Sequence, residues 1–216
     1  YRLPYDTIQR EIDLIVSMGV EMHYETRVGT DITMAQLQQD NDAVVLAIGL
    51  WLGRSTRIPG SDHPQVKKAV ELLRRITDGE AIQAPEKLVV IGGGNVAMDI
   101  ARSMARLQQQ QHGKIAVTLT ALEDKAHFLA DPVEIKESIE EEITILDSRG
   151  PQACIVDERG EFIGLRTWKV LSIFDEQGRF APTYDDNDEQ VHEGDWVIEA
   201  IGQMSDVSLL GEALTE

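Results

Sequence analysis

Three consecutive glycines, Gly92 to Gly94, are the residues whose types and spacing point most directly to chemistry. They follow the apolar run Lys87 to Ile91 and open a helical pattern, in the order GxGxxA with Ala97 last. Gly92 permits a tight turn after a buried strand, Gly94 lets the backbone approach a pyrophosphate, and Ala97 lets the helix pack closely. Free N–H groups at the helix N-terminus attract the anion. The stretch therefore predicts a dinucleotide-binding turn, and the alternative is a plain strand-to-helix turn.

A βαβ unit around the turn supplies the elements that must hold it. Its helix is expected at Val96–Leu107, followed by a frayed end and loop at 108–113, and its second strand at Ile115–Leu122. A further, acidic helix is expected at Asp131–Glu142, capped by Asp131 with Pro132 at its first position. The pattern indicates an α/β fold with a parallel sheet.

Short strands separated by turns begin after Ile143. Strands at 161–173 and around 179–182 predict an antiparallel β insertion laid on the parallel sheet, and the acidic stretch 185–193 is expected as a surface loop. The apolar run Asp195–Ile201 then returns to a buried strand.

The chain before the turn carries a second set of expected elements. These are a helix at Thr7–Met18, strands at Val20–Val28 and Asp42–Ile48, a Pro/Gly-rich domain crossing at 58–64 and a helix at Val66–Ile76.

Two of the expected strands share an ending. DAVVLAIG at 42–49 and DWVIEAIG at 195–202 both close on Ala-Ile-Gly, one on each side of the glycine turn. Small residues at two strand ends would allow a flat ring or a second domain to approach the backbone. Two ordinary buried strands that end in glycine would give the same pattern.

The composition limits the classes of partner. The 216 residues are 42% apolar, enough for a globular core in one or two domains, and 20 Lys and Arg against 38 Asp and Glu give a net charge of −18. This acidity argues against nucleic acid and anionic membranes. No signal-peptide pattern and no apolar run near the roughly 18 residues of a membrane span is recognised in these residues, so a cytoplasmic protein is expected. A start at YRLP without Met suggests a segment of a longer protein.

The ligand-forming residues do not indicate a metal. Cys154 is the only cysteine, which excludes an intrachain disulfide, a Cys-x-x-Cys pair and a cysteine-rich iron–sulfur site, and it is expected to be small and buried. The five histidines are scattered without His-Glu-x-x-His spacing, so no metal site is expected.

The chain resembles the small subunit of NADPH-dependent glutamate synthase and its relatives, flavoenzymes with two dinucleotide-binding domains like the disulfide reductases. The matching stretches, in the family's order, are YRLP, EIDLIVSMGVE, DAVVLAIG, IPGSDH, IGGGNVAMDIAR and VIEAIGQ. The resemblance implies a Rossmann-like NAD(P)H-binding domain at 61–203, inserted in a partial FAD-binding domain at 1–60 that resumes at 204–216. It also implies electron flow from NAD(P)H through FAD to iron–sulfur centres or a partner subunit.

The resemblance also assigns roles to individual residues, although the family's upstream FAD fingerprint, its later Gly-Asp motif and its cysteine clusters are missing. FAD would thus belong to the full-length protein, and iron–sulfur clusters would lie outside this chain. No catalytic acid or base is assigned, because the cofactors carry hydride transfer. The implied cofactor-binding residues are Gly92, Gly93, Gly94, Asn95, Val96 and Ala97 for the pyrophosphate, Ala200, Ile201 and Gly202 for the nicotinamide, and Ala47, Ile48 and Gly49 for the flavin.

One departure from the family bears on the choice of nucleotide. NADPH-using members end the second strand in Tyr-Arg-Arg, where this chain has Ala121, Leu122 and Glu123. A carboxylate there can accept hydrogen bonds from an unphosphorylated ribose and repels a 2′-phosphate, so NADH is favoured. The 31-residue spacing from Gly92, longer than the usual roughly 20, leaves open that Glu123 is merely exposed.

Two other classes of function share part of this pattern. A short-chain dehydrogenase needs a Tyr-x-x-x-Lys pair, which none of the four tyrosines provides. A non-catalytic dinucleotide-binding or sensing module needs only the glycine turn and a ribose contact, and it stays open.

Overall fold

The computed structural model describes residues 3–208, and the chain divides into two compact units. Residues 50–204 form one contiguous unit, which interrupts a second unit made of residues 1–49 and 205–216. The nucleotide domain expected at 61–203 lies within the contiguous unit. The predicted return to an FAD domain at 204–216 lies mostly outside the described residues.

A five-stranded parallel sheet is the centre of the unit 50–204. Apolar, β-branched runs such as LVVI form its inner strands, which are buried on both faces as parallel strands must be. In spatial order the strands are β2 (Val66–Lys68), β9 (Trp196–Glu199), β3 (Leu88–Ile91), β4 (Val117–Thr120) and β5 (Thr144–Leu146).

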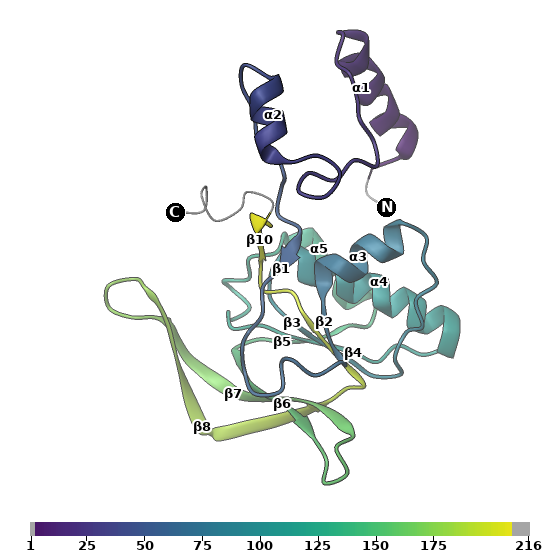
Figure 1. Cartoon of the computed structure of the whole chain (residues 1–216). Helices are drawn as coiled ribbons and strands as arrows, with labels where there is room; N and C mark the ends of the chain where they lie inside the picture. Colours follow the sequence, from purple (N-terminus) through teal and green to yellow (C-terminus); the bar gives the residue numbers. More distant parts are fainter. Residues whose placement is uncertain (1–2, 209–216) are drawn as a thin grey trace. The chain divides into compact units, whose positions relative to one another are not determined.

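Three helices lie together along one face of this sheet (Figure 1): α3 (Ala69–Thr77), α4 (Asn95–His112) and α5 (Pro132–Glu140). The buried side of α4 carries Ala97, Met98, Ile100, Ala101 and Met104, which share one apolar core with Leu88, Val90 and Ile198 of the strands. Packing of this apolar stripe, more than helix propensity, holds α4 against the sheet.

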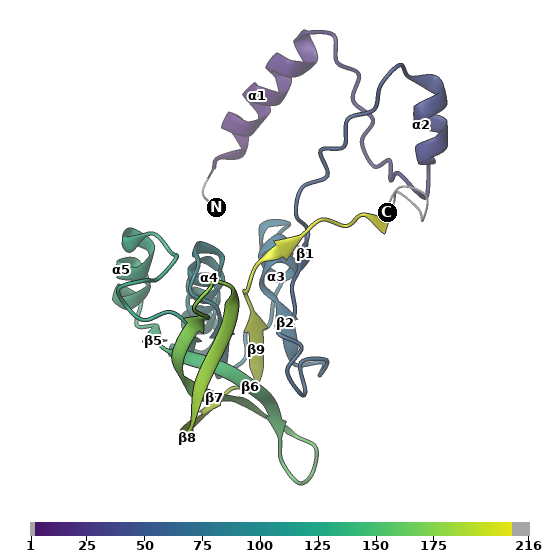
Figure 2. The same cartoon turned by 90° about the vertical axis from the view of Figure 1, so that its left-hand side faces the viewer.

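An antiparallel sheet covers the other face (Figure 2). Its strands are β6 (Arg149–Val156), β7 (Phe162–Phe174) and β8 (Phe180–Glu193). Leu165 of β7 packs with Val89 and Val197 of the parallel sheet. The predicted α/β fold with a parallel βαβ core and an antiparallel β insertion is therefore confirmed.

A short antiparallel pair, β1 (Leu52–Gly53) with β10 (Gln203–Met204), lies where the unit 50–204 begins and ends (Figure 1). Two stretches about 150 residues apart in the sequence thus run side by side.

The unit that contains the N-terminal part has helices α1 (Tyr5–Ser17) and α2 (Met34–Asp40) in its described residues. The first helix was predicted, whereas the strands expected at 20–28 and 42–48 are wrong. A strand needs a neighbour to accept its hydrogen bonds, and residues 3–49 contain no strand to pair with. Accordingly, Val45 is 87% exposed.

Two predicted helix boundaries in the unit 50–204 are wrong. The helix expected from Val66 begins only at Ala69, after β2. The tract 108–113 is not frayed, because α4 continues to His112. Gln108 is fully buried, where its amide donates to the Pro85 carbonyl at 2.8 Å and accepts from the Ala116 N–H at 2.8 Å.

The acidic stretch 185–193 is also not a loop, since it forms most of β8. Two of its carboxylates have partners on other strands of the sheet: Asp188 accepts from Arg149 at 2.7 Å, and Glu189 accepts from the Trp168 indole N–H at 3.1 Å. These partners make a charged strand compatible with the sheet.

Candidate dinucleotide-binding site

The carboxyl ends of three parallel strands meet at one edge of the sheet. Ile91, the last residue of β3, is in register with Thr120 at the end of β4 and with Glu199 at the end of β9. The segments that follow these strands, 92–94, 121–123 and 200–202, therefore lie at the same edge. Nucleotides bind at this edge of open α/β sheets.

Gly92 turns the chain directly after β3. Its φ is +142°, and a Cβ atom at this position would collide with the Ala200 carbonyl and come within 3.3 Å of the Ala97 Cβ. The turn thus packs tightly against the end of β9 and the first turn of α4. Only glycine both adopts this φ without strain and leaves room for the Ala200 carbonyl.

Gly94 is the N-cap of α4 and presents the opposite situation. Its φ of −97° and ψ of 176° are open to any residue, and a Cβ atom there would have nothing within 4 Å. The space beside Gly94 is thus open, at the end of an 18-residue helix whose first N–H groups have no intrahelical acceptor. This combination forms a cradle that fits an anion such as a pyrophosphate.

Glu123 lies against the glycine turn. A Cβ atom on Gly93 would come within 2.8 Å of the Glu123 Oε2 and 3.0 Å of the Phe128 ring. The long spacing from Gly92 is taken up by α4, and the half-buried Glu123 and Leu122 still reach the same edge. The structure thus brings the predicted ribose-binding residue to the predicted pyrophosphate turn.

The loop before α5 also holds the glycine turn, through two hydrogen bonds that no sequence pattern indicated. The Asn95 Oδ1 accepts from the Asp131 N–H at 2.7 Å, and the Gly93 carbonyl accepts from the Ala130 N–H at 3.0 Å. Asp131 also caps α5, because its Oδ1 accepts from the Val133 N–H at 2.8 Å. Because Oδ1 already accepts this hydrogen bond, the side-chain NH₂ group of Asn95 is the one that can donate to a phosphate, as expected from its place near the phosphates.

The Ala200–Gly202 segment is fixed at both ends. The Ala200 N–H donates to the Ile91 carbonyl at 2.8 Å, and the Gly202 carbonyl accepts from the Arg54 N–H at 3.0 Å. Ile201, between these anchors, is 36% exposed. Val96 and Ala97, the other expected residues, form the first turn of α4, with Ala97 fully buried.

The three residues expected near a flavin are not brought to this edge by the described contacts. Ala47, Ile48 and Gly49 belong to the other unit, where they form no strand and Ala47 and Gly49 are exposed. Their expected role stays a prediction.

A buried ion pair at the same edge also escaped sequence reasoning. The Glu199 carboxylate, whose side chain is 1% exposed, pairs with the Lys68 ammonium at the end of β2. It also accepts from the Thr56 N–H at 2.7 Å, the Thr56 hydroxyl at 2.5 Å and the Ser55 hydroxyl at 3.3 Å. A Lys and a Glu 131 residues apart give no signal in sequence, since only the β2–β9 register aligns them.

Cys154 is buried, as predicted. Burial in the first place, and the nearby Glu199 charge in addition, raise the pKa of its thiol to about 11, so it stays protonated at neutral pH. Among residues 3–208, no group of three or more His, Cys, Asp or Glu side chains is placed to hold a metal ion.

A parallel α/β sheet with an open glycine cradle at its carboxyl edge defines a Rossmann-like nucleotide-binding fold. The family model described as pyridine nucleotide-disulphide oxidoreductase matches residues 6–215, and the chain belongs to that family. The suspected resemblance is therefore confirmed at the level of the family.

Two relatives and one solved structure illustrate the match. The chain is 34% identical to the NADPH-Fe(3+) oxidoreductase subunit beta of Geobacter sulfurreducens, over 99% of this chain and 32% of that protein. It is also 34% identical to the NAD-dependent dihydropyrimidine dehydrogenase subunit PreT of Escherichia coli, over 71% of this chain and 36% of that protein. It thus spans about a third of the length of these relatives.

The structure of FprA from Mycobacterium tuberculosis in complex with NADPH matches 82% of this chain and 53% of its own, with a TM-score of 0.65 at 16% identity. At this identity the similarity shows the fold alone. No helix in residues 3–208 is long and apolar enough to cross a membrane.

Proposed function

We propose that this chain is the pyridine-nucleotide-binding part of a flavin-dependent oxidoreductase that passes electrons from NAD(P)H through FAD to iron–sulfur centres or a partner subunit. The observation that carries the proposal is the cradle at Gly94, with open space at the N-terminus of α4 and the Glu123 carboxylate beside the turn. In this arrangement Gly92 to Ala97 bind the pyrophosphate and Glu123 orients the ribose.

Two segments of this chain are proposed to face the two rings that exchange the hydride. The segment Ala200–Gly202 would lie along the nicotinamide ring, with exposed Ile201 between its two hydrogen-bonded ends. FAD, when bound, accepts the hydride, and the residues of this chain bind and orient the nucleotide. Ala47, Ile48 and Gly49 are proposed to face the flavin.

The proposal also includes an electron-accepting partner protein and a cytoplasmic location. The two relatives described above are named as subunits, one acting on Fe(3+) and one as part of a dihydropyrimidine dehydrogenase. This supports a role for this chain in delivering electrons to a partner protein, and we place that role in the cytoplasm.

NADH is the proposed nucleotide. The loop 121–131 that follows β4 has Glu123 beside the turn and Asp124 after it in the sequence, and Lys125 is its one Lys or Arg. A 2′-phosphate at this place would meet the Glu123 carboxylate where NADP-specific sites have arginine. The named relatives include users of both nucleotides, so the preference rests on Glu123.

The experiment that tests the proposal is rapid mixing of the full-length, FAD-loaded protein with NADH, recording the loss of flavin absorbance. The proposal expects reduction that saturates with NADH concentration. A protein that binds NADH and leaves its flavin oxidised would instead be a dinucleotide-sensing module.

A further inference from the structure

The buried carboxylate of Glu199 lies at the junction of three segments of the unit 50–204. It belongs to the end of β9, its ammonium partner Lys68 to the end of β2, and its hydroxyl and N–H donors to Ser55 and Thr56, which follow β1. All four donors converge on two oxygen atoms that solvent does not reach. No step of the proposed reaction uses this group directly.

The segment 54–56 that Glu199 holds is the same segment that holds the end of the nicotinamide edge. The Arg54 N–H donates to the Gly202 carbonyl at 3.0 Å, and the pairing continues from Gly53 to Gln203 in the β1–β10 pair (Figure 1). Lys68 also reaches the Arg54 carbonyl at 3.4 Å. The Glu199 carboxylate therefore fixes the segment whose Arg54 N–H donates to the Gly202 carbonyl.

The other end of the Ala200–Gly202 segment rests on the glycine turn. The Ala200 N–H donates to the Ile91 carbonyl, and the Ala200 carbonyl fills the space where Gly92 lacks a side chain. With both ends fixed, Ile201 can take only a narrow range of positions. Loss of the Glu199 contacts would free the Gly202 end and leave the Ala200 end in place.

A buried ion pair is a poor means of adding stability. The desolvation of two charges offsets most of their attraction, and an apolar pair of similar volume is often as stable or more stable. Here the pair and its hydroxyl donors specify one geometry, since the carboxylate must face Lys68 and Thr56 together. A role in positioning explains its presence better than a role in stability.

We infer that Glu199 is a positioning residue, which with Lys68 and Thr56 sets the place of the Ala200–Gly202 segment against the nicotinamide ring. The inference rests on the proposed function for the identity of the ring, and on the hydrogen bonds alone for the effect on the segment.

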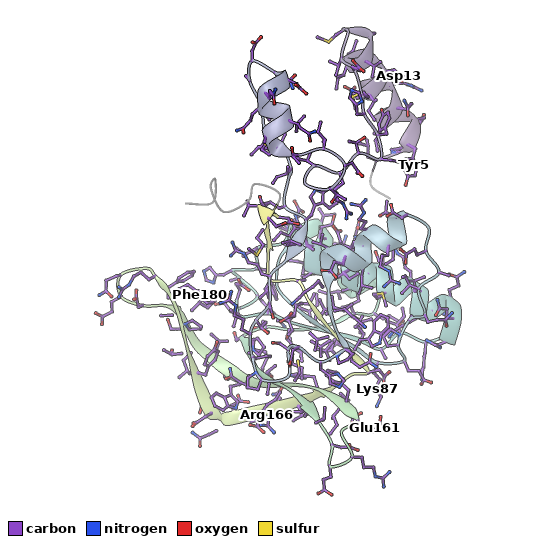
Figure 3. The ribbon with its side chains drawn as sticks, viewed as in Figure 1. Tyr5, Asp13, Lys87, Glu161, Arg166 and Phe180 are labelled. Carbon is purple, nitrogen blue, oxygen red and sulfur yellow. The ribbon has the colours of Figure 1, made fainter. Side chains whose placement is uncertain are left out.

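The test uses a double variant, Glu199→Leu with Lys68→Met, which removes both charges together. A matched control, Lys87→Met with Glu193→Leu, removes the exposed pair that Lys87 forms near the amino-terminal end of β3, away from β1 and β10 (Figure 3). Three quantities are measured: the melting temperature, amide hydrogen exchange of the Arg54 N–H, and flavin reduction by NADH in the full-length, FAD-loaded protein.

For the Glu199 and Lys68 double variant we expect an unchanged or higher melting temperature. We also expect about ten-fold faster exchange at the Arg54 N–H with unchanged protection of β3, because only the local anchor is lost. The flavin reduction rate should fall about ten-fold while the NADH dissociation constant stays within about two-fold. The control should match the parent in all three.

Unchanged exchange at the Arg54 N–H would overturn the inference, and so would faster exchange with an unchanged reduction rate. If the double variant melts much lower, Thr56→Val, which keeps both charges and removes one hydroxyl donor to Glu199, takes its place: faster exchange at the Arg54 N–H with slower reduction would support the inference, and unchanged exchange would overturn it. A parent that does not bind NADH at all would remove the proposed function, and the exchange measurement would then still decide whether Glu199 anchors the segment.

Discussion

The Ala200 carbonyl lies where a side chain on Gly92 would have to stand. This contact joins the end of β9 to the turn after β3, so the expected nicotinamide segment and the expected pyrophosphate turn are one packed unit. The two glycines of the motif consequently have separable tasks, since Gly92 serves the packing and Gly94 the open cradle.

A pair of glycine variants separates these tasks. Gly94→Val adds a side chain to open space, so the fold should persist while the pyrophosphate cradle is filled and NADH affinity falls at least about ten-fold. Gly92→Ala meets the Ala200 carbonyl at a positive φ, so it should lower the free energy of unfolding by roughly 2 kcal/mol. Thermal melting and calorimetric titration measure both; a Gly94→Val protein that binds NADH normally would contradict the assignment.

The nucleotide preference is tested by changing the residues after β4. Leu122→Arg with Glu123→Arg replaces a carboxylate beside Gly93 with two guanidinium groups that can pair with a 2′-phosphate. NADPH affinity should rise and NADH affinity fall, each by about ten-fold, in titrations at one salt concentration. If NADH binds the double variant as it binds the parent, Glu123 does not contact the ribose.

These residues also show what the sequence alone could predict. The glycine turn, its flanking strand and helix, and the Asp131 cap depend on local spacing, and all four were found, although the helix continues to His112 and not only to Leu107. The strand at 42–48 failed because an apolar run carries no information about whether a neighbouring strand exists. Gln108, Glu199 and the carboxylates of β8 were missed because their partners are distant in sequence.

Arg102 provides a prediction on stability. Its side chain is 10% exposed and pairs with Glu134 at 2.8 Å, Glu137 at 2.7 Å and Glu141 at 2.9 Å, which ties α4 to α5. Burial alone would raise the pKa of Glu141, but hydrogen bonds from Arg106 and Arg102 outweigh it and lower the pKa.

Arg102→Met removes this cation from Glu134 and Glu137, while Glu141 keeps Arg106, and should cost about 3 kcal/mol of unfolding free energy. Lys136→Met, which breaks an exposed pair with Glu140 on the same helix, is the control and should cost no more than about 0.5 kcal/mol. Chemical denaturation measures both. Equal costs for the two variants would mean that the Arg102 network contributes little.

His192 predicts how stability depends on pH. Burial, aided by the nearby Arg149 charge, lowers the pKa of His192 below its usual value of 6.5, and its Nε2 lies 2.8 Å from the Thr167 hydroxyl. The unfolded chain therefore takes up a proton at a higher pH than the folded chain does. Stability from this group is complete above the unfolded pKa and is lost as pH falls through 6.5 towards the folded pKa.

The variant His192→Gln should flatten that part of the curve. Unfolding free energies of parent and variant, measured from pH 7.5 to pH 5, roughly one pH unit either side of an ordinary histidine pKa, give the comparison. A parent whose stability does not decline more steeply than that of the variant over this range would contradict the role of His192.

Calorimetric titration of this chain with NADH and NADPH, at one fixed salt concentration, is the most direct test of dinucleotide binding at the glycine turn. We expect one molecule of NADH to bind each chain, more tightly than NADPH, and Gly94→Val to abolish the heat while keeping the fold. A folded chain that binds neither nucleotide, or one whose binding survives Gly94→Val, would show that the glycine turn is a structural feature and not a dinucleotide site.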